Sequence, residues 1–351
     1  MTAHTTHEHQ ARLTLAHSPD ADDMVMWWPL VGMRAPDGTR VPGPLGEPAL
    51  DTGRFAFQLR ADDVERLNQS AADERLDITA LSAGAYPFVQ HDYAITRAGS
   101  SFGEGYGPKL VVRDGAMSDQ IVQSGGSIDE MGDPISPETL EILGAMRGQR
   151  VAVPGLRTTA LLVLRLAFRE ACETSTTRSE ASRAEFEPVP MLFDLVPQAV
   201  SSGECAAGLL IHEAQIACER FGLRPALDLG QWWHAHTAAT DEPLPLPLGL
   251  NVLRRDLDER FGDGSCREVA ELLARSVAHA RAHRDDCVRF LRLHAARRPE
   301  WNDDALVHRY LDMYVSQLTQ DMGEQGRRAL THLYTEAASL GITPVSTLDI
   351  L

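Results

Sequence analysis

Two stretches of the chain share one layout, and this repetition limits the possible folds more than any other feature. In residues 62–89 and in residues 194–213, a helical segment behind an acidic residue is followed by a turn, an apolar strand and a second helical segment. Each strand ends at a polar residue, Ser82 or His212. Alternating helices and strands are typical of α/β architecture, so we predict two α/β lobes built on one plan.

The order of the segments indicates a first lobe that is discontinuous in sequence. Residues 1–11 are polar and predict a disordered tail. We expect residues 12–113 together with 250–351 to form the first lobe, and residues 150–249 to form the second. Residues 114–149 begin with a stretch rich in Gly, Ser and Asp, and we interpret them as an insertion between the lobes.

The C-terminal part of the chain predicts helices only. Apolar residues recur at helical spacing from Glu268 to Leu293, and two further helices are expected at Asp303–Leu318 and Glu324–Leu340.

Charge and composition argue against several kinds of partner. The 351 residues include 33 Lys and Arg against 50 Asp and Glu, a formal net charge of −17. Such an acidic surface repels nucleic acid and anionic membranes, so neither is an expected partner. The chain has no run of about 18 apolar residues, and its N-terminus has no apolar signal segment. The five cysteines are scattered without a C-x-x-C pair, which favours a reduced, cytoplasmic protein. The oligomeric state stays open.

Two motifs that would indicate a cofactor or a metal are incomplete. The glycines of residues 103–107 have the spacing G-x-G-x-G, and a proline and a strand follow where a dinucleotide-binding loop would open a helix. His212-Glu213 begins like a zinc-protease motif, but Ile216 stands where the second histidine would be. We therefore predict no metal and no dinucleotide cofactor.

Four polar residues beside strand or helix ends have a functional and a structural interpretation. His212 ends an apolar strand, where open α/β sheets place ligand-binding residues. It is either a general base, with Glu213 or a backbone carbonyl fixing its tautomer, or a hydrogen-bonded structural histidine. Thr158 and Thr159 precede a long helix and either hold a substrate carboxylate or cap the helix. Ser82 has the same ambiguity.

Two further groups were considered for binding. Asp20, Asp22 and Asp23 either bind a metal or substrate hydroxyls, or form a solvated capping turn. The segment Trp232–His236, with two tryptophans and two histidines, is interpreted as packing at a lobe edge rather than as a cofactor cage.

Six sequence blocks within residues 12–290 together resemble one known family. The blocks are Asp77–Pro87, Ser101–Pro108, Val153–Ala160, Gly208–Glu213, Asp228–Trp233 and Leu246–Gly249. In this order they resemble the 1,4-dihydroxy-6-naphthoate synthase family of the futalosine route to menaquinone, a branch of a superfamily related to solute-binding proteins.

The resemblance implies a fold, a reaction and a set of site residues. The fold is the two-lobed, type II periplasmic-binding-protein fold, with a ligand cleft between the lobes. The reaction is the cleavage of cyclic dehypoxanthinyl futalosine to 1,4-dihydroxy-6-naphthoate, a carbon–carbon lyase step without a cofactor. The family's proposed base corresponds to His212. Its substrate-binding positions correspond to Ala80, Leu81, Ser82, Thr158 and Thr159.

One turn departs from the family pattern. The family commonly has Cys-Pro-Asn-Asp-Thr after its first strand, whereas residues 18–23 here form a turn that is one residue longer and carries Asp20, Asp22 and Asp23. We expect Asp22 and Asp23 to contact substrate hydroxyls, and an extra carboxylate could alter substrate choice. The alternatives are chorismate dehydratase, on the same fold and pathway, and a non-catalytic protein that binds a small carboxylate.

Overall fold

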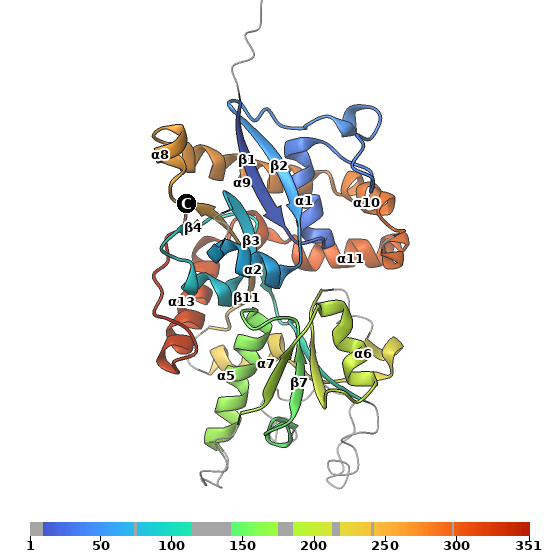
Figure 1. Ribbon diagram of the computed structural model, residues 1–351, viewed down its shortest axis with the longest axis vertical. Helices are drawn as coiled ribbons and strands as arrows, with labels where there is room; N and C mark the ends of the chain where they lie inside the picture. Colours follow the sequence, from blue (N-terminus) through green and yellow to red (C-terminus); the bar gives the residue numbers. More distant parts are fainter. Residues whose placement is uncertain are drawn as a thin grey trace, which may run out of the picture.

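Two β-sheets, one in each lobe, form the framework of the molecule, and Figure 1 shows them one above the other. The first sheet contains, in order, β2 (Phe55–Ala61), β1 (Ala11–His17), β3 (Ile78–Ser82), β11 (Leu246–Arg254) and β4 (Tyr93–Ile95), and β5 (Ser101–Gly103) pairs with β11. The second sheet contains β10 (Leu223–Asp228), β6 (Lys109–Arg113), β9 (Ala207–Leu210), β7 (Arg150–Val153) and β8 (Glu187–Pro190). The computed structural model describes residues 10–73, 76–113, 142–174, 185–212, 218–239, 242–296 and 298–351.

Helices cover both faces of each sheet. In the first lobe, α1 (Ala21–Val31), α9 (Ser265–Ala282), α10 (Arg284–Leu293) and α11 (Asp304–Tyr314) share one apolar core with β1, β2 and β3, while α2 (Val64–Asp73) packs on the other face. In the second lobe, α5 (Thr159–Thr174) and α7 (Leu229–Ala238) pack on one face and α6 (Val196–Ser201) on the other. The other α-helices of the described residues are α8 (Leu257–Phe261), α12 (Gln317–Gln320) and α13 (Gly323–Ser339).

Alternating side chains explain why the second sheet carries helices on both faces. Successive residues of a strand point to opposite faces. In β6, Leu110 and Val112 belong to the core beneath α5, whereas Val111 belongs to the core beneath α6. All three are apolar, which is the composition expected for a strand that is buried on both sides.

The chain passes between the lobes twice. It leaves the first lobe between β5 and β6 and returns between α7 and β11. This differs from the expected boundaries at both crossings. We assigned residues 109–113 to the first lobe, but β6 pairs antiparallel with β9 and β10 in the second sheet. Residues 246–249 were assigned to the second lobe, but β11 lies wholly in the first sheet.

Three other expectations concern segment boundaries. Ala11, expected in the tail, is the first residue of β1, and residues 1–9 lie outside the described part. Residues 114–141 of the expected insertion lie outside the described part of the chain. Its later residues Ile142, Leu143 and Met146 are buried in the core beneath α5. The helix expected over residues 268–293 is wrong as a single unit, because α9 ends before His283 (φ −119°, ψ 52°) and α10 begins after it.

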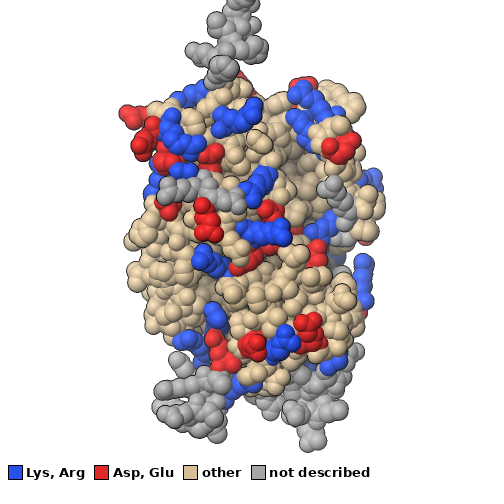
Figure 2. Space-filling view, in the orientation of Figure 1, with Lys and Arg blue, Asp and Glu red and all other residues tan. Residues whose placement is uncertain are grey.

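Surface properties agree with the composition. Within the described residues, no helix is both long enough and apolar enough to cross a membrane. On the face shown in Figure 2, the described Lys and Arg side chains lie among Asp and Glu side chains and form no continuous basic surface.

Parallel strands bring polar residues of both lobes to one place. β1 is parallel to β3, and β7 is parallel to β9. The carboxyl ends of parallel strands in one sheet meet at the same edge, which is where α/β folds place their ligands. Residues 18–23 follow β1, and Ser82 ends β3. In the second lobe, residues 154–159 follow β7 and His212 comes shortly after β9.

Candidate active site

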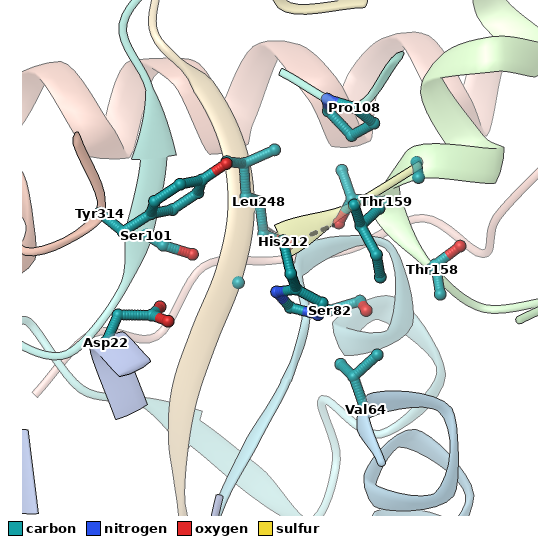
Figure 3. A pocket seen from close by; sticks show the side chains of 13 residues that line it. Asp22, Val64, Ser82, Ser101, Pro108, Thr158, Thr159, His212, Leu248 and Tyr314 are labelled. Atoms are coloured by element: carbon teal, nitrogen blue, oxygen red, sulfur yellow. Dashed lines mark hydrogen bonds between the residues drawn. The ribbon is translucent and has the colours of Figure 1, made fainter. Parts of the chain in front are cut away.

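A cavity of about 90 Å³ lies where these strand ends face each other (Figure 3). The first lobe contributes residues from α1, α2, α11 and three strands, and the second contributes residues from the loops after β7 and β9. The lining residues are Asp22, Val64, Ser82, Ser101, Leu248, Gly249 and Tyr314 from the first lobe, and Pro108, Thr158, Thr159, Ala160, Ile211 and His212 from the second lobe and its entry.

His212 has an unusual backbone and a cross-lobe partner. Its φ of 54° is the single positive value among the described non-glycine residues, and this left-handed conformation costs about 1–2 kcal/mol for an ordinary side chain. Figure 3 shows the imidazole pointing into the cavity. Its Nδ1 atom lies 3.0 Å from Oδ2 of Asp20, in the first lobe, and Phe193 packs edge-on against the ring at 5.1 Å between centroids. Strain of this kind is typical of functional positions.

Asp20 is buried within the turn that follows β1. Its side chain is 1% exposed. The Ser18 hydroxyl donates to the same oxygen that faces His212, at 2.6 Å, and Arg298 lies 4.0 Å from the other oxygen. Burial raises the pKa of Asp20 to about 7, although the Ser18 hydrogen bond and Arg298 oppose the shift. Asp20 therefore changes charge close to neutral pH.

Asp22 and Asp23 complete an acidic group on the first turn of α1. The Tyr310 hydroxyl donates to Oδ1 of Asp22 at 3.0 Å, and the Ser18 amide donates to Oδ2 of Asp23 at 2.7 Å. Burial is the main cause that raises the pKa of Asp22 to about 7 and that of Asp23 to about 6, and for Asp22 the neighbouring carboxyls add to it. Because a helix N-terminus favours negative charge, this placement offsets part of the cost of burying carboxyl groups.

Ser82 is held by a residue that the sequence did not single out. The Ser82 amide donates to Oδ1 of Asn68 at 2.9 Å, and Nδ2 of Asn68 lies 3.3 Å from the Ser82 hydroxyl. Asn68 is fully buried on α2. The amide side chain therefore fixes the end of β3 and orients the hydroxyl beside the cavity.

Thr158 and Thr159 sit at the start of α5 with different tasks. The Thr158 hydroxyl lies 3.4 Å from the Leu161 amide, in the position of a helix cap. The Thr159 hydroxyl donates to the Leu248 carbonyl at 2.7 Å and accepts from the Gly84 amide at 3.0 Å. Since Leu248 and Gly84 belong to the first lobe, Thr159 joins the two walls of the cavity.

A second contact across the cleft involves Glu65 of α2. The amides of Leu156 and Arg157, in the loop after β7, donate to its two carboxylate oxygens at 3.1 and 3.3 Å. The observed conformation is thus one in which the lobes touch through several hydrogen bonds.

Five of the predicted site residues share the cavity and three do not line it. The five are Asp22, Ser82, Thr158, Thr159 and His212. Ala80 packs in a small core with residues of β1 and α2, and Leu81 lies in the large core beneath α5. Asp23 is turned toward the Ser18 amide. Glu213, expected as a possible orienting partner of His212, lies outside the described residues.

The cavity itself offers few metal ligands. Its lining contains one histidine and one carboxylate, whereas zinc sites in enzymes use three protein ligands. The glycines of residues 103–107 lead into the strand β6, as predicted, whereas a dinucleotide-binding loop opens a helix. The described residues of this cavity thus support acid–base chemistry and hydrogen bonding to a small polar ligand.

A family model and several known proteins match this chain. The model, described as menaquinone biosynthesis, matches residues 13–339. A Thermus thermophilus protein named 1,4-dihydroxy-6-naphtoate synthase is 34% identical over 334 residues, covering 95% of this chain and 97% of its own length. A Streptomyces coelicolor protein of the same name is 30% identical over 332 residues, covering 95% of each chain.

Solved structures show the same architecture. An Archaeoglobus fulgidus protein superposes with a TM-score of 0.69 at 32% identity, covering 96% of this chain and all of that one. A Candida albicans protein described as having the generic periplasmic binding protein fold gives a TM-score of 0.57 at 7% identity, covering 96% of this chain and 92% of that one. At that identity the second match supports the fold alone.

The two lobes and the polar cavity between their strand ends define a protein of the periplasmic-binding-protein fold class, as predicted. The chain belongs to the menaquinone-biosynthesis family. The family predicted from the six sequence blocks is therefore confirmed, and with it a role as an enzyme of menaquinone biosynthesis.

Proposed function

We propose that this protein is a 1,4-dihydroxy-6-naphthoate synthase that cleaves cyclic dehypoxanthinyl futalosine, with His212 as the general base. The observation that carries the proposal is the pairing of His212, at 3.0 Å, with the buried Asp20 at the wall of a cavity lined by hydroxyl groups. The names of the two relatives supply the product. The substrate is the one that the family resemblance implies.

Asp20 gives His212 the tautomer that a base needs. A carboxylate that accepts a hydrogen bond from Nδ1–H leaves the lone pair of the imidazole on Nε2. Nε2 then takes the proton of a hydroxyl group in the sugar-derived part of the substrate. The oxygen of that group forms a carbonyl as the adjacent carbon–carbon bond to the carbocycle breaks. The electron pair of the broken bond stays in the carbocycle, which becomes aromatic, and His212 returns its proton to the products. This lyase step requires a base and hydrogen-bond donors, and it requires no cofactor.

The remaining lining residues position the substrate. The Ser82 hydroxyl donates to the substrate carboxylate at the N-terminus of α5, where the helix dipole favours negative charge. The hydroxyls of Thr158 and Thr159, which donate to the carbonyls of Gly155 and Leu248, turn to the carboxylate when substrate binds. Asp22 contacts substrate hydroxyls. Asp23 acts indirectly, since its hydrogen bond from the Ser18 amide holds the turn that carries Asp20.

Closure of the cleft assembles the catalytic pair. His212 belongs to the second lobe and Asp20 to the first, so their contact requires the lobes to meet. Pockets for small organic ligands are typically about 300–1,000 Å³, several times the 90 Å³ of this cavity. We infer that the lobes open to admit substrate and close on it through contacts with both walls. A carboxylate bound at Thr159 favours the closed state.

We propose that the reaction takes place in the cytoplasm. All five cysteines are unpaired, which suits a reducing compartment.

Direct assay of the purified protein tests the proposed function. Cyclic dehypoxanthinyl futalosine and chorismate are supplied in separate reactions, and products are followed by ultraviolet absorption and identified by mass. We expect 1,4-dihydroxy-6-naphthoate from the first substrate and no change in the second. Dehydration of chorismate would instead identify a chorismate dehydratase. Tight binding of a small carboxylate without turnover of either compound would identify a binding protein.

A further inference from the structure

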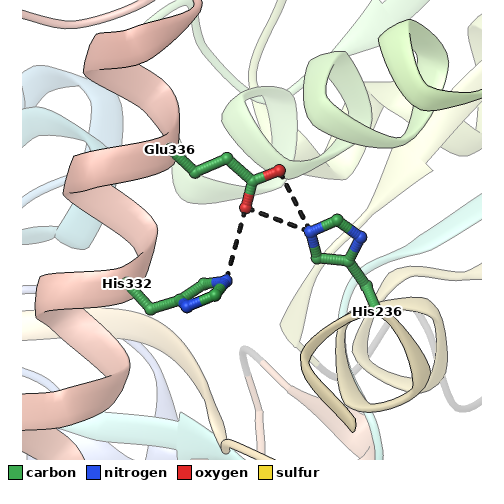
Figure 4. A group of neighbouring side chains, drawn as sticks. All are labelled: His236, His332 and Glu336. Carbon is green, nitrogen blue, oxygen red and sulfur yellow. Dashed lines mark hydrogen bonds and ion pairs between the residues drawn. The ribbon is translucent and has the colours of Figure 1, made fainter. Parts of the chain in front are cut away.

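A cluster of two histidines and a glutamate lies away from the residues that line the cleft cavity. His236 is on α7, and His332 and Glu336 are one turn apart on α13 (Figure 4). One potential ligand atom from each residue lies within 4.8 Å of the others. α7 follows the last strand of the second sheet, whereas α13 packs in the core that also contains β11, so the cluster joins segments of both lobes.

We propose that His236, His332 and Glu336 form a site for a divalent transition metal of the zinc class. Imidazole and carboxylate together suit zinc, and three protein ligands leave a fourth position for water. Zinc bonds of about 2.0–2.2 Å in a tetrahedron place neighbouring ligand atoms about 3.3 Å apart. Nε2 of His236 lies 3.1 Å from Oε2 of Glu336, and Nε2 of His332 lies 3.6 Å from the same oxygen. Two of the three spacings that the metal requires are therefore nearly in place, and all the ligand atoms lie within 4.8 Å of one another.

Glu170 orients the imidazole of His236. Metal-binding histidines almost always donate their other ring nitrogen to a carboxylate or carbonyl. Nδ1 of His236 lies 3.3 Å from Oε2 of Glu170 on α5, and Nε1 of Trp232 donates to the same oxygen at 3.0 Å. This arrangement holds Nδ1 toward Glu170 and presents Nε2 to the metal position.

Two tryptophans hold the imidazole rings in place. The ring of His236 stacks on Trp232 at 4.7 Å between centroids, and the ring of His332 packs edge-on against Trp233 at 5.4 Å. Both tryptophans are buried, which agrees with the packing expected of the segment Trp232–His236. Rings fixed by packing lose little further freedom when they bind a metal.

The charge of the cluster also favours a cation. The carboxylates of Glu170 and Glu336 face the two ring nitrogens of His236, at 3.3 and 3.0 Å. These two negative charges attract a divalent cation that binds between His236, His332 and Glu336. The side chains of His236 and His332 are 20% and 32% exposed, which leaves a path for an ion.

Zinc titration of the full chain tests this site. His4, His7 and His9 of the N-terminal tail are replaced by Asn in the parent protein, because they would bind metal independently. Zinc affinity is measured by competition with a chromophoric chelator, and Co²⁺ absorption reports the ligand type. We expect one tight Zn²⁺ per chain, a tetrahedral Co²⁺ spectrum without a thiolate band, and a higher melting temperature with Zn²⁺.

Matched variants separate metal binding from an ion-pair cluster. Glu170→Gln should weaken Zn²⁺ binding by about 10–100-fold, and His332→Asn or Glu336→Gln by more. His234→Asn, an exposed histidine on the same helix α7, should bind as the parent does. Circular dichroism checks that each variant is folded. The proposal is overturned if the parent binds no stoichiometric Zn²⁺, if Co²⁺ shows a thiolate band, or if Glu170→Gln and His332→Asn bind as tightly as the parent.

Discussion

Nδ1 of His212 lies 3.0 Å from Oδ2 of Asp20, although the two residues follow strands of different sheets. The carboxyl group of Asp20 is almost completely buried, and the Ser18 hydroxyl donates to the same oxygen. A histidine and carboxylate pair of this kind fixes the imidazole tautomer, as required for proton transfer at Nε2. Because each lobe supplies one partner, a movement that opened the cleft would separate the pair.

Replacing Asp20 should impair turnover through the histidine. Asp20→Asn keeps the size of the side chain but removes the carboxylate. Removal of a general base lowers kcat by roughly 10²–10⁴-fold, and we expect Asp20→Asn to lower kcat by up to this factor. Burial raises the pKa of Asp20 to about 7, so wild-type activity should rise with pH through neutrality as the carboxylate forms. That rise should shift or disappear in the variant. An unchanged pH–rate profile would show that Asp20 has only a structural role.

The half-buried carboxyl of Asp22 should reduce stability as pH rises. Burial raises its pKa from 3.8 to about 7, with Asp23 and Asp20 adding to the shift. Between pH 3.8 and about pH 7, Asp22 keeps its proton in the folded state and loses it in the unfolded chain. The free energy of unfolding therefore falls as the pH rises through this range to about 7. Asp22→Asn cannot ionise. The free energy of unfolding of Asp22→Asn minus that of wild type should therefore be larger at pH 8 than at pH 4, by at least about 1 kcal/mol.

Urea unfolding at several pH values measures this difference. His17, whose pKa burial lowers to about 4, has the opposite pH dependence, but it is present in both proteins and cancels. Asp92→Asn, at an exposed position, serves as the control. A constant difference between Asp22→Asn and wild type across the range would contradict the inferred burial of the carboxyl group.

Thr159 should contribute to cleft closure. Thr159→Val keeps the shape but leaves the Gly84 amide and the Leu248 carbonyl without this partner, a loss of about 1–3 kcal/mol in the closed state. Small-angle scattering should show that substrate compacts the wild type and compacts this variant less. Thr331→Val, at an exposed position on α13, should behave as wild type. If the saturated wild-type complex keeps the radius of gyration of the free protein, closure is not the assembling step.

The sequence predicted the positions of the main site residues because they obey a local rule. Ser82 and His212 end or follow apolar strands, and Thr159 begins a helix after a strand. In parallel α/β sheets such positions meet at one edge. The two-lobed architecture followed from the same alternation of helices and strands.

The contacts between lobes could not be predicted in the same way. The pairing of Asp20 with His212 depends on how two separately folded sheets face each other, and neither local sequence encodes that geometry. The sequence could not predict which sheet contains residues 109–113, because an apolar strand next to a crossover can pair with strands of either lobe. The sequence did not indicate the contact of Asn68 with Ser82, because a buried asparagine on a helix cannot be distinguished by sequence from a solvent-exposed one.

Turnover of His212→Asn tests the central claim most directly. Asn tolerates the left-handed backbone of residue 212 better than Ala does, so the change removes the imidazole without adding strain. Rates of naphthoate formation are compared for wild type, His212→Asn and the exposed control His91→Asn, and calorimetry measures substrate binding. The account predicts that His212→Asn binds cyclic dehypoxanthinyl futalosine within a few-fold of wild type and turns it over about 10²–10⁴ times more slowly. Turnover at the wild-type rate would contradict it.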